Sequence, residues 1–477
     1  MQNRITSKTH RKLFTATATI ALMGLSATPV AANSLIAEQY DGGKSRVNRA
    51  FALRGVTEAF ASAACRYDGN YDIETARYDL QHVHDNFEAV LHGLEHGDRA
   101  LGMPGEETSP RILQAIAKTH ELWDPMEEAS RHMLEGTSTP KEVAIITEGY
   151  HDLFEQTDIM AADVSGEYTN PQELLQSDAT ILNFAGRQRM LAQRMTRAVC
   201  ELASDVHVDV AISELTATVD MFDLSLVALR DGYPAAGVNP PPNETVKKSL
   251  EDAYALWQAN RGIYDTILSG THATADDVAA SNAMTRELMV SMNNVITLYL
   301  LATPGKDGVY RVPLEAYAET ELSTWINDPR VIEAVKAQNI LHADLSQADI
   351  DALDQQWRAE AGADGGPMMT AALSSPVSEW LLEHQDTTAG FITEAFVMDM
   401  HGLNVAQSVA TSDYWQGDEA KYQETYLIGP DALHISDVEL DESTGFYQAQ
   451  ASLPVVDPAT GEVIGAMTFG VNVQSLM

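Results

Sequence analysis

Residues 183–195 read NFAGRQRMLAQRM, and residues 48–60, which lie 135 positions earlier, read NRAFALRGVTEAF. Arg54 and Arg189 occupy equivalent places in the two stretches. Further identical pairs follow at the same offset: Asn48 and Asn183, Cys65 and Cys200, Phe87 and Phe222, Leu94 and Leu229, and Gly97 and Gly232. Chance matches would scatter over many offsets, so this common offset indicates an internal repeat.

Each repeat unit predicts four helices, because apolar residues recur at spacings of three, four and seven. The first and third helices are expected at 47–66 and 110–134 in one unit and at 181–203 and 244–268 in the other. Thr139 and Thr274, each followed by acidic residues, are typical helix caps and predict the start of the fourth helix. The simplest architecture is two tandem up-and-down four-helix bundles, over residues 45–170 and 178–303.

The last third of the chain has a different pattern. A helical segment over residues 313–385 is followed by short apolar runs and turns. Three runs predict strands, at 396–399, 453–457 and 463–471, and the last is apolar enough to be central. We expect an α+β domain with a PAS-like antiparallel sheet over residues 310–477. The predicted fold class is therefore mostly α with a C-terminal α+β domain.

The composition excludes several classes of protein. The chain has 477 residues, of which 45% are hydrophobic and 21% charged, enough for about three domains that each bury a core. The formal net charge is −39, which repels phosphate backbones, so we expect no binding to nucleic acid. The sequence lacks a nucleotide loop and a nucleophile elbow. We therefore expect no enzymatic activity and no cofactor.

The first 32 residues have the features of a secretory signal peptide. Basic residues precede an apolar stretch from Leu13 to Leu25, and small residues precede Asn33. The alternative is an uncleaved membrane anchor. The rest of the sequence contains no apolar run of about 18 residues, so we expect a soluble mature protein that is periplasmic or secreted.

Cys65 and Cys200 are disulfide candidates, because a disulfide persists outside the cytoplasm. Each cysteine follows Arg54 or Arg189 by eleven residues, or three helical turns plus about 20°, so arginine and cysteine share one stripe of their helix. If the two first helices pair side by side, the cysteines meet and the arginines meet. The alternative is two free thiols buried in separate bundles.

Polar and basic side chains are concentrated in the 183–195 segment. Arg187, Arg189, Gln193 and Arg194 lie close together, and Arg189 and Gln193 share a helix face because they are four residues apart. An arginine fork on a helix suits a small planar anion. The alternative is that these arginines pair with the abundant carboxylates of the protein.

This segment resembles the signature of the type IV pili methyl-accepting chemotaxis transducer N-terminal (PilJ-type) domain. That domain is related to the periplasmic sensor of the NarX-like nitrate/nitrite kinases. The resemblance covers most of residues 180–300 and, more faintly, 45–170. It implies a periplasmic four-helix bundle that senses small ligands. In the nitrate sensors an arginine at the position of Arg189 binds the anion at a symmetric dimer interface.

The first repeat unit departs from this pattern. It keeps Arg54, but Phe51 replaces the glycine and Glu58 replaces the glutamine. Because Glu58 lies one helical turn from Arg54, we expect it to neutralise the arginine. The hypothesis is that one chain reproduces a sensor dimer locked by Cys65–Cys200.

The sequence from His92 to His96 matches the His-x-x-Glu-His pattern of zinc proteases. The equivalent residues 227–231 contain no histidine, and Gly93 weakens the helix. We therefore favour a solvated helix face over a zinc site.

Residues 310–477 are similar to extracellular Cache (PAS-like) sensor domains, on the segments 396–408, 411–422 and 454–476. The resemblance implies a small-molecule pocket between the sheet and a segment that contains Tyr414, Trp415, Asp418 and Tyr422. The alternative is that Trp415 and Tyr422 close the core of the sheet.

Together these features predict an exported sensory or ligand-binding protein. Its ligand would be a nitrate- or nitrite-like anion or a metabolite, and its signal would pass to a membrane receptor or kinase. The alternatives are an envelope scaffold that has lost ligand binding and a metallohydrolase.

Overall fold

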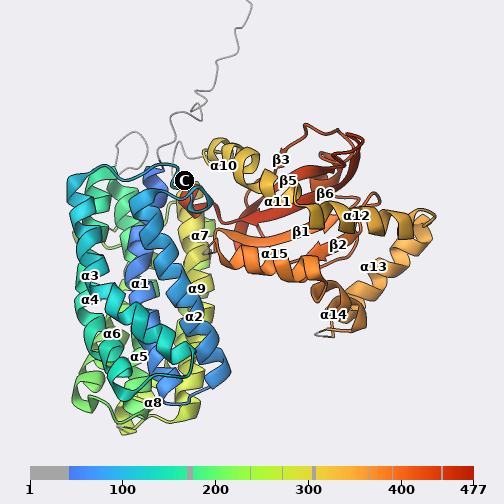
Figure 1. The fold of residues 1–477 in the computed structure, drawn as a ribbon. Helices are drawn as coiled ribbons and strands as arrows, with labels where there is room; N and C mark the ends of the chain where they lie inside the picture. The colour runs from blue at the N-terminus through green and yellow to red at the C-terminus, as the bar shows by residue number, and fades with distance from the viewer. Residues whose placement is uncertain are drawn as a thin grey trace, which may run out of the picture. The chain divides into compact units, whose positions relative to one another are not determined.

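The computed structural model describes residues 42–168, 176–236, 238–270, 272–302, 308–363, 365–388, 390–441 and 444–476. The predicted signal peptide over residues 1–32 lies outside these ranges. Within them, no helix combines the length and the apolar character that crossing a membrane requires. The chain is mostly helical and ends in an antiparallel sheet, as the sequence predicts (Figure 1).

The helical region comprises α1 (Gly43–Asp68), α2 (Ile73–His96), α3 (Pro110–Leu134), α4 (Pro140–Tyr168), α5 (Gln176–Ala203), α6 (Val208–Asp231), α7 (Glu244–Asn260), α8 (Gly262–Gly270) and α9 (Ala275–Ala302). The axes of the long helices are roughly aligned in Figure 1. The helix expected at 244–268 is divided into α7 and α8, and Gly262 lies at the division. Glycine disfavours an uninterrupted helix because its backbone loses more conformational freedom than that of other residues. Buried residues from all nine helices belong to one continuous hydrophobic cluster.

Local backbone geometry repeats at the offset of 135 residues. Asp72 and His207 precede α2 and α6 with φ of 48° and 46°. Gly97 and Gly232 end the same two helices with φ of 79° and 83°, a region that favours glycine. The helices therefore start and stop at equivalent residues because the same turn conformations flank them.

The helices α1 and α5 pack against each other at equivalent residues. A Cβ atom placed on Gly55 would lie 3.8 Å from the Met190 backbone nitrogen, and Met190 is the equivalent of Gly55. Further along both helices, Cys65 and Cys200 form a disulfide with a Cα–Cα distance of 6.3 Å. Since two successive equivalent pairs meet, α1 and α5 run side by side in the same direction. The alternative of two free thiols does not hold in this structure.

The segment expected to be helical over residues 313–385 is a series of shorter elements: α10 (Arg311–Tyr317), the π-helix η4 (Ala318–Leu322), α11 (Ser323–Ile326), α12 (Pro329–His342), α13 (Gln347–Ala361), α14 (Pro367–Leu373) and α15 (Pro376–Asp386). Proline occupies the first turn of α12, α14 and α15. Proline is favourable there because the first backbone amides of a helix lack intrahelical partners. The breaks before α12, α14 and α15 therefore follow from Pro329, Pro367 and Pro376, whereas α13 begins at a capping box formed by Ser346 and Asp349.

The sheet contains β1 (Ile392–Met398), β2 (Asn404–Gln407), β3 (His434–Ile435), β4 (Glu439–Leu440), β5 (Tyr447–Val456) and β6 (Val463–Val471). Its order is β2-β1-β6-β5-β3, with β4 also paired to β5, and every pairing is antiparallel. The prediction that 463–471 forms a central strand is confirmed, because β6 lies between β1 and β5. Two short helices complete this region, α16 (Ala420–Gln423) and the 3-10 helix η5 (Val473–Leu476).

The two faces of the sheet bury different side chains, because successive strand residues point to opposite sides. Val397 on β1 belongs to the main hydrophobic cluster, where Trp325 lies edge-on to Phe469 at 5.6 Å between ring centroids. Its neighbour Phe396 joins a second cluster that contains Tyr422. Both faces of β1 are therefore covered.

Candidate functional site

Arg54 on α1 is buried and its charge is compensated within the protein. Its Nη1 donates to Asp158 Oδ1 at 2.9 Å, and its Nη2 donates to Asn183 Oδ1 at 3.0 Å. The ring of Phe51 lies 5.0 Å from the guanidinium carbon. Burial lowers the pKa of Arg54, and the hydrogen-bonded Asp158 opposes that shift. A carboxylate of α4 therefore occupies the position where an anion would bind to this arginine.

Arg189 on α5 has a neutral partner at the equivalent place. Its Nη1 donates to Asn293 Oδ1 at 2.8 Å, and Asn293 is the residue that corresponds to Asp158. Burial, together with the positive charges of Arg54 and Arg49, lowers the pKa of Arg189 to about 10. None of the ion pairs among the described residues joins Arg189 to a carboxylate. The Arg189 guanidinium is thus a cation at pH 7 without an acidic partner from these parts of the chain.

Gly186 lies between the two guanidinium groups. A Cβ atom placed there would be 3.5 Å from Arg54 Nη2 and 3.9 Å from Arg189 Nη2. The equivalent residue in α1 is Phe51, whose ring lies against Arg54. Glycine at position 186 therefore leaves space beside Arg189 that a larger side chain would fill.

A cavity of about 400 Å³ adjoins Arg189. The polar part of its wall includes Asn48, Arg49, Asn86, Arg189, Gln193 and Asn293. Its apolar part includes Leu53, Val83 and Met289. No aspartate or glutamate is among the described residues that line it. In a chain with a net charge of −39, a cavity with arginines and no acidic wall is suited to an anion.

The expectation that Glu58 neutralises Arg54 is wrong. Glu58 is 1% exposed and accepts hydrogen bonds from Arg194 Nε at 2.7 Å and from Arg197 Nε at 3.0 Å. Arg197 is further paired with Glu201 and Glu214. Glu58 turns toward α5 because that helix presents two guanidinium groups, while Arg54 is already held by Asp158.

Of the other two residues predicted for this site, Gln193 lines the cavity and Arg187 does not. Gln193, the equivalent of Glu58, lines the cavity together with Arg189. Arg187 is exposed and is not among the residues that line the cavity. Sequence reasoning missed Asn293 and Asp158, although the offset of 135 residues relates them and shows that the acid is absent from the second unit.

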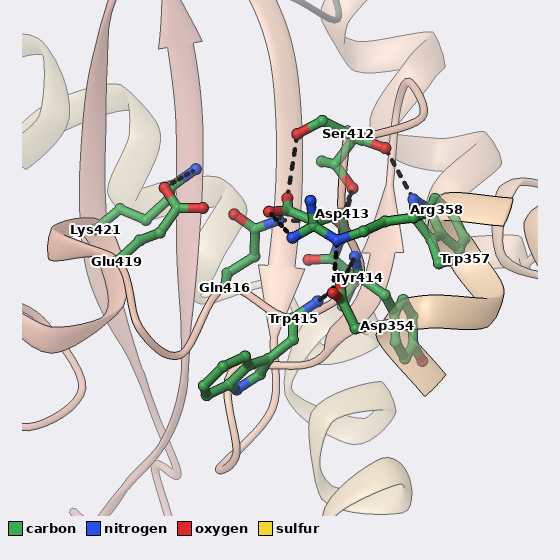
Figure 2. Close-up of polar contacts among 12 residues, drawn as sticks. Asp354, Trp357, Arg358, Ser412, Asp413, Tyr414, Trp415, Gln416, Glu419 and Lys421 are labelled. Carbon is green, nitrogen blue, oxygen red and sulfur yellow. Dashed lines mark hydrogen bonds and ion pairs between the residues drawn. The ribbon is translucent and has the colours of Figure 1, made fainter. Parts of the chain in front are cut away.

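Tyr414 and Trp415 lie together beside a carboxylate of α13. Both backbone nitrogens donate to Asp354 Oδ1, at 2.9 and 3.1 Å. Figure 2 shows their rings pointing in different directions from this carboxylate. The Tyr414 ring stacks on Trp357 at 5.4 Å, and Trp415 Nε1 donates to the backbone oxygen of His401 at 2.9 Å. The two backbone nitrogens and the Trp415 indole N–H therefore all have hydrogen-bond partners within the protein.

Tyr422 lies in a different cluster. Its hydroxyl donates to the Met400 backbone oxygen at 2.5 Å, and its ring stacks on Tyr426 at 4.9 Å. Burial raises the pKa of both Tyr414 and Tyr422. Asp418 is exposed. Trp415 and Tyr422 donate to the adjacent backbone oxygens of His401 and Met400, so both approach one turn, although Tyr422 packs in a different hydrophobic cluster from Tyr414. None of these four residues lines the cavity at Arg189.

The histidine motif of α2 has no metal-binding geometry in the structure. The rings of His92 and His96 lie 4.9 Å apart, and His96 Nε2 is 3.6 Å from Glu95 Oε2. Among the residues with described positions, no group of three or more histidine, cysteine, aspartate or glutamate side chains is arranged to hold a metal ion.

Comparison with known proteins gives one match. The family described as "PilJ: Type IV pili methyl-accepting chemotaxis transducer N-term" matches residues 173–282, a range that includes Arg189 and Gln193. No curated protein and no solved structure matches the chain. Residues 173–282 are therefore similar to the N-terminal region of type IV pili chemotaxis transducers, which suggests a sensory region of chemotaxis signalling.

Proposed function

We propose that the helical region is a sensor for a small anion, which Arg189 binds in the cavity between α1, α5 and α9. The observation that carries this proposal is the neutral partner of Arg189. Asn293 stands where the equivalent arginine, Arg54, is paired with Asp158. In the second unit, Arg189 has no acidic partner among the described residues. We propose that the ligand supplies the anion.

The electrostatics of the cavity support anion binding. Taking a guanidinium out of water is costly unless an anion compensates its charge. At Arg189 burial and two nearby arginines lower the pKa, so the folded protein disfavours this cation. A bound anion reverses both effects, and the arginine fork can donate two hydrogen bonds to a planar oxyanion. Anion binding therefore relieves an electrostatic penalty that the ligand-free protein carries at Arg189.

We propose further that the chain is a tandem PilJ-type sensor related to the NarX-like nitrate sensors, in which α1 and α5 take the roles of two subunits. The meeting of Gly55 with Met190 and of Cys65 with Cys200 supports this reading. The disulfide supports an exported protein, because disulfides persist outside the reducing cytoplasm. A membrane receptor or kinase would receive the signal, and the sheet region would be a Cache-like module.

The test is anion binding to the full chain, measured by thermal shift and by calorimetry with nitrate and nitrite at constant ionic strength. A ligand that binds the folded state raises the melting temperature by mass action. Asn293→Asp should weaken anion binding at least tenfold, because the new carboxylate reproduces the Arg54–Asp158 pair. The matched control is Asn327→Asp, the same change at an exposed residue after α11.

The outcomes separate the sensor from the scaffold. A sensor binds at least one anion, loses binding in Asn293→Asp and keeps it in Asn327→Asp. A scaffold that has lost ligand binding shows no anion-dependent change in melting temperature. Equal binding by wild type and Asn293→Asp would place the anion away from Arg189 and would refute the proposed site.

A further inference from the structure

We infer that an anion at Arg189 stabilises the docking of the sheet region on α9, so that ligand binding in the helical region is transmitted to the sheet. The sheet region comprises α10 and the elements that follow it. This inference rests on the proposed function, because it names what the proposed anion regulates. It is carried by a cavity wall that both regions share and by hydrogen bonds that join them beside the partner of Arg189.

The wall of the cavity at Arg189 comes from both regions. Helices α1, α2, α5 and α9 contribute one part of it, and residues of the sheet region, including Ile392, Phe446 and Gln474, contribute another. The effective dielectric constant is lower where protein replaces water, and the attraction between opposite charges is then stronger. Undocking of the sheet region would replace part of this wall by water. An anion at Arg189 should therefore bind the docked state more tightly than the undocked state.

Two consecutive residues of α9, Asn293 and Asn294, hold the sheet region. The Asn294 side chain binds the backbone just before and within β5: its Nδ2 donates to the Gly445 oxygen at 2.8 Å, and its Oδ1 accepts from the Tyr447 nitrogen at 3.0 Å. The Asn293 backbone oxygen accepts from Gln474 Nε2 of η5 at 2.7 Å. One turn of α9 thus binds two separate segments of the sheet region.

Asn293 contacts the guanidinium as well as the sheet region. Its side-chain oxygen accepts from Arg189 Nη1 at 2.8 Å, while its backbone oxygen accepts from Gln474. Because one residue makes both contacts, a movement of Arg189 on anion binding would displace the residue to which the sheet region is bonded. The site and the docking contacts are therefore joined by a single residue.

The first half of the helical region lacks these docking groups. Asp158 and Ile159 of α4 are the equivalents of Asn293 and Asn294. Ile159 is 54% exposed, and its hydrocarbon side chain can form neither of the hydrogen bonds that Asn294 makes. The two asparagines therefore occur together in the half whose arginine has a neutral partner.

The first test uses the wild-type full chain. Hydrogen–deuterium exchange of the Tyr447 amide reports docking, because this N–H donates to Asn294. A ligand that binds only the docked state should slow this exchange about tenfold at ten times its Kd. The probes are nitrate and nitrite, with sodium chloride at equal ionic strength as the control. The reference amide is that of Gly362, which is bonded within the end of α13 and should not change.

Variants check that the reporter and the site are the ones named. Asn294→Ile, which copies Ile159, should speed the exchange of Tyr447 about threefold or more without anion, since the amide loses its acceptor. The matched control Ile159→Asn, at the exposed equivalent position, should leave it unchanged. Asn293→Asp, which should weaken anion binding, should lose the slowing by nitrate at the same concentration.

The outcomes separate this inference from the proposed function. The inference is overturned if calorimetry shows a bound anion but the exchange of Tyr447 is unchanged, or if Asn294→Ile leaves that exchange unchanged. It is also overturned if the slowing persists in Asn293→Asp after anion binding is lost, because the effect would then be one of salt. If neither nitrate nor nitrite binds to the wild-type chain, the proposed function itself fails.

Discussion

Arg54 and Arg189 occupy equivalent positions on α1 and α5, yet they differ in charge compensation. In both cases the Nη1 atom donates to a residue 104 positions later in the chain. That residue is Asp158 in the first half of the helical region and Asn293 in the second. The geometry of the two pairs is conserved while the charge of one partner has changed. A difference of one carboxylate therefore separates an internal ion pair from an arginine that has a neutral partner.

The same contrast recurs one helical turn away. Glu58 is buried against Arg194 and Arg197, whereas its equivalent Gln193 lines the cavity beside Arg189. The first half uses its acidic side chains for structural ion pairs, and the second half has amides at the same places.

The largest effect is expected from removing the bond between the halves. Cys65→Ala together with Cys200→Ala should lower the free energy of unfolding by about 4–5 kcal/mol, because the disulfide joins residues 135 positions apart and restricts the unfolded chain. Urea denaturation measures this loss, with reduced wild type as the control. A loss below about 1 kcal/mol would mean that packing of α1 on α5 suffices.

The next effect is expected from the buried carboxylate of the first half. Glu58→Gln should lower the free energy of unfolding by about 3 kcal/mol, because the buried guanidinium of Arg197 and the half-buried one of Arg194 lose an anionic partner. The reciprocal change Gln193→Glu should alter it by less than about 1 kcal/mol but should abolish anion binding. Denaturation and calorimetry on both variants check this. Equal destabilisation by the two changes would contradict the division between the halves.

Asp158→Asn makes the first half resemble the second. We expect a loss of about 1–2 kcal/mol, since the Asp158 side chain is 57% exposed and solvent screens part of the interaction. Nitrate should then stabilise the variant more than wild type, because Arg54 gains the neutral environment of Arg189. Melting temperatures over a nitrate series test this, with sodium chloride at equal ionic strength as the control. An unchanged response would show that Phe51 closes this site without help from Asp158.

The smallest effect is expected at the glycine between the arginines. Gly186→Ala should raise the free energy of unfolding by about 0.5–1 kcal/mol, because alanine favours the helix and its Cβ atom has ordinary contact distances here. Gly186→Phe, which copies Phe51, should weaken anion binding instead. Thermal unfolding and calorimetry distinguish the two. A destabilising alanine would show that the space beside Arg189 is tighter than its backbone surroundings indicate.

Much of the fold follows from local sequence signals. The helix ends at Gly97 and Gly232, the caps at Thr139 and Thr274 and the central strand at 463–471 are all visible in the sequence, because turn conformations, caps and apolar runs depend on neighbouring residues. The division of the 313–385 segment was less visible, since its breaks required weighing each proline separately. The partners of Glu58 were predicted wrongly because a residue one turn away competed with two arginines on another helix.

By itself, the sequence determined the repeat, the places of the helices and the identity of the arginines on equivalent faces. The tertiary structure alone decided which residues face the two arginines, and therefore which arginine has no carboxylate partner among the described residues. That outcome depends on α4 and α9, which bring Asp158 and Asn293 to arginines more than a hundred residues earlier. The physical reason is that helix formation is local, whereas the energy of a buried charge depends on every group that folding places around it.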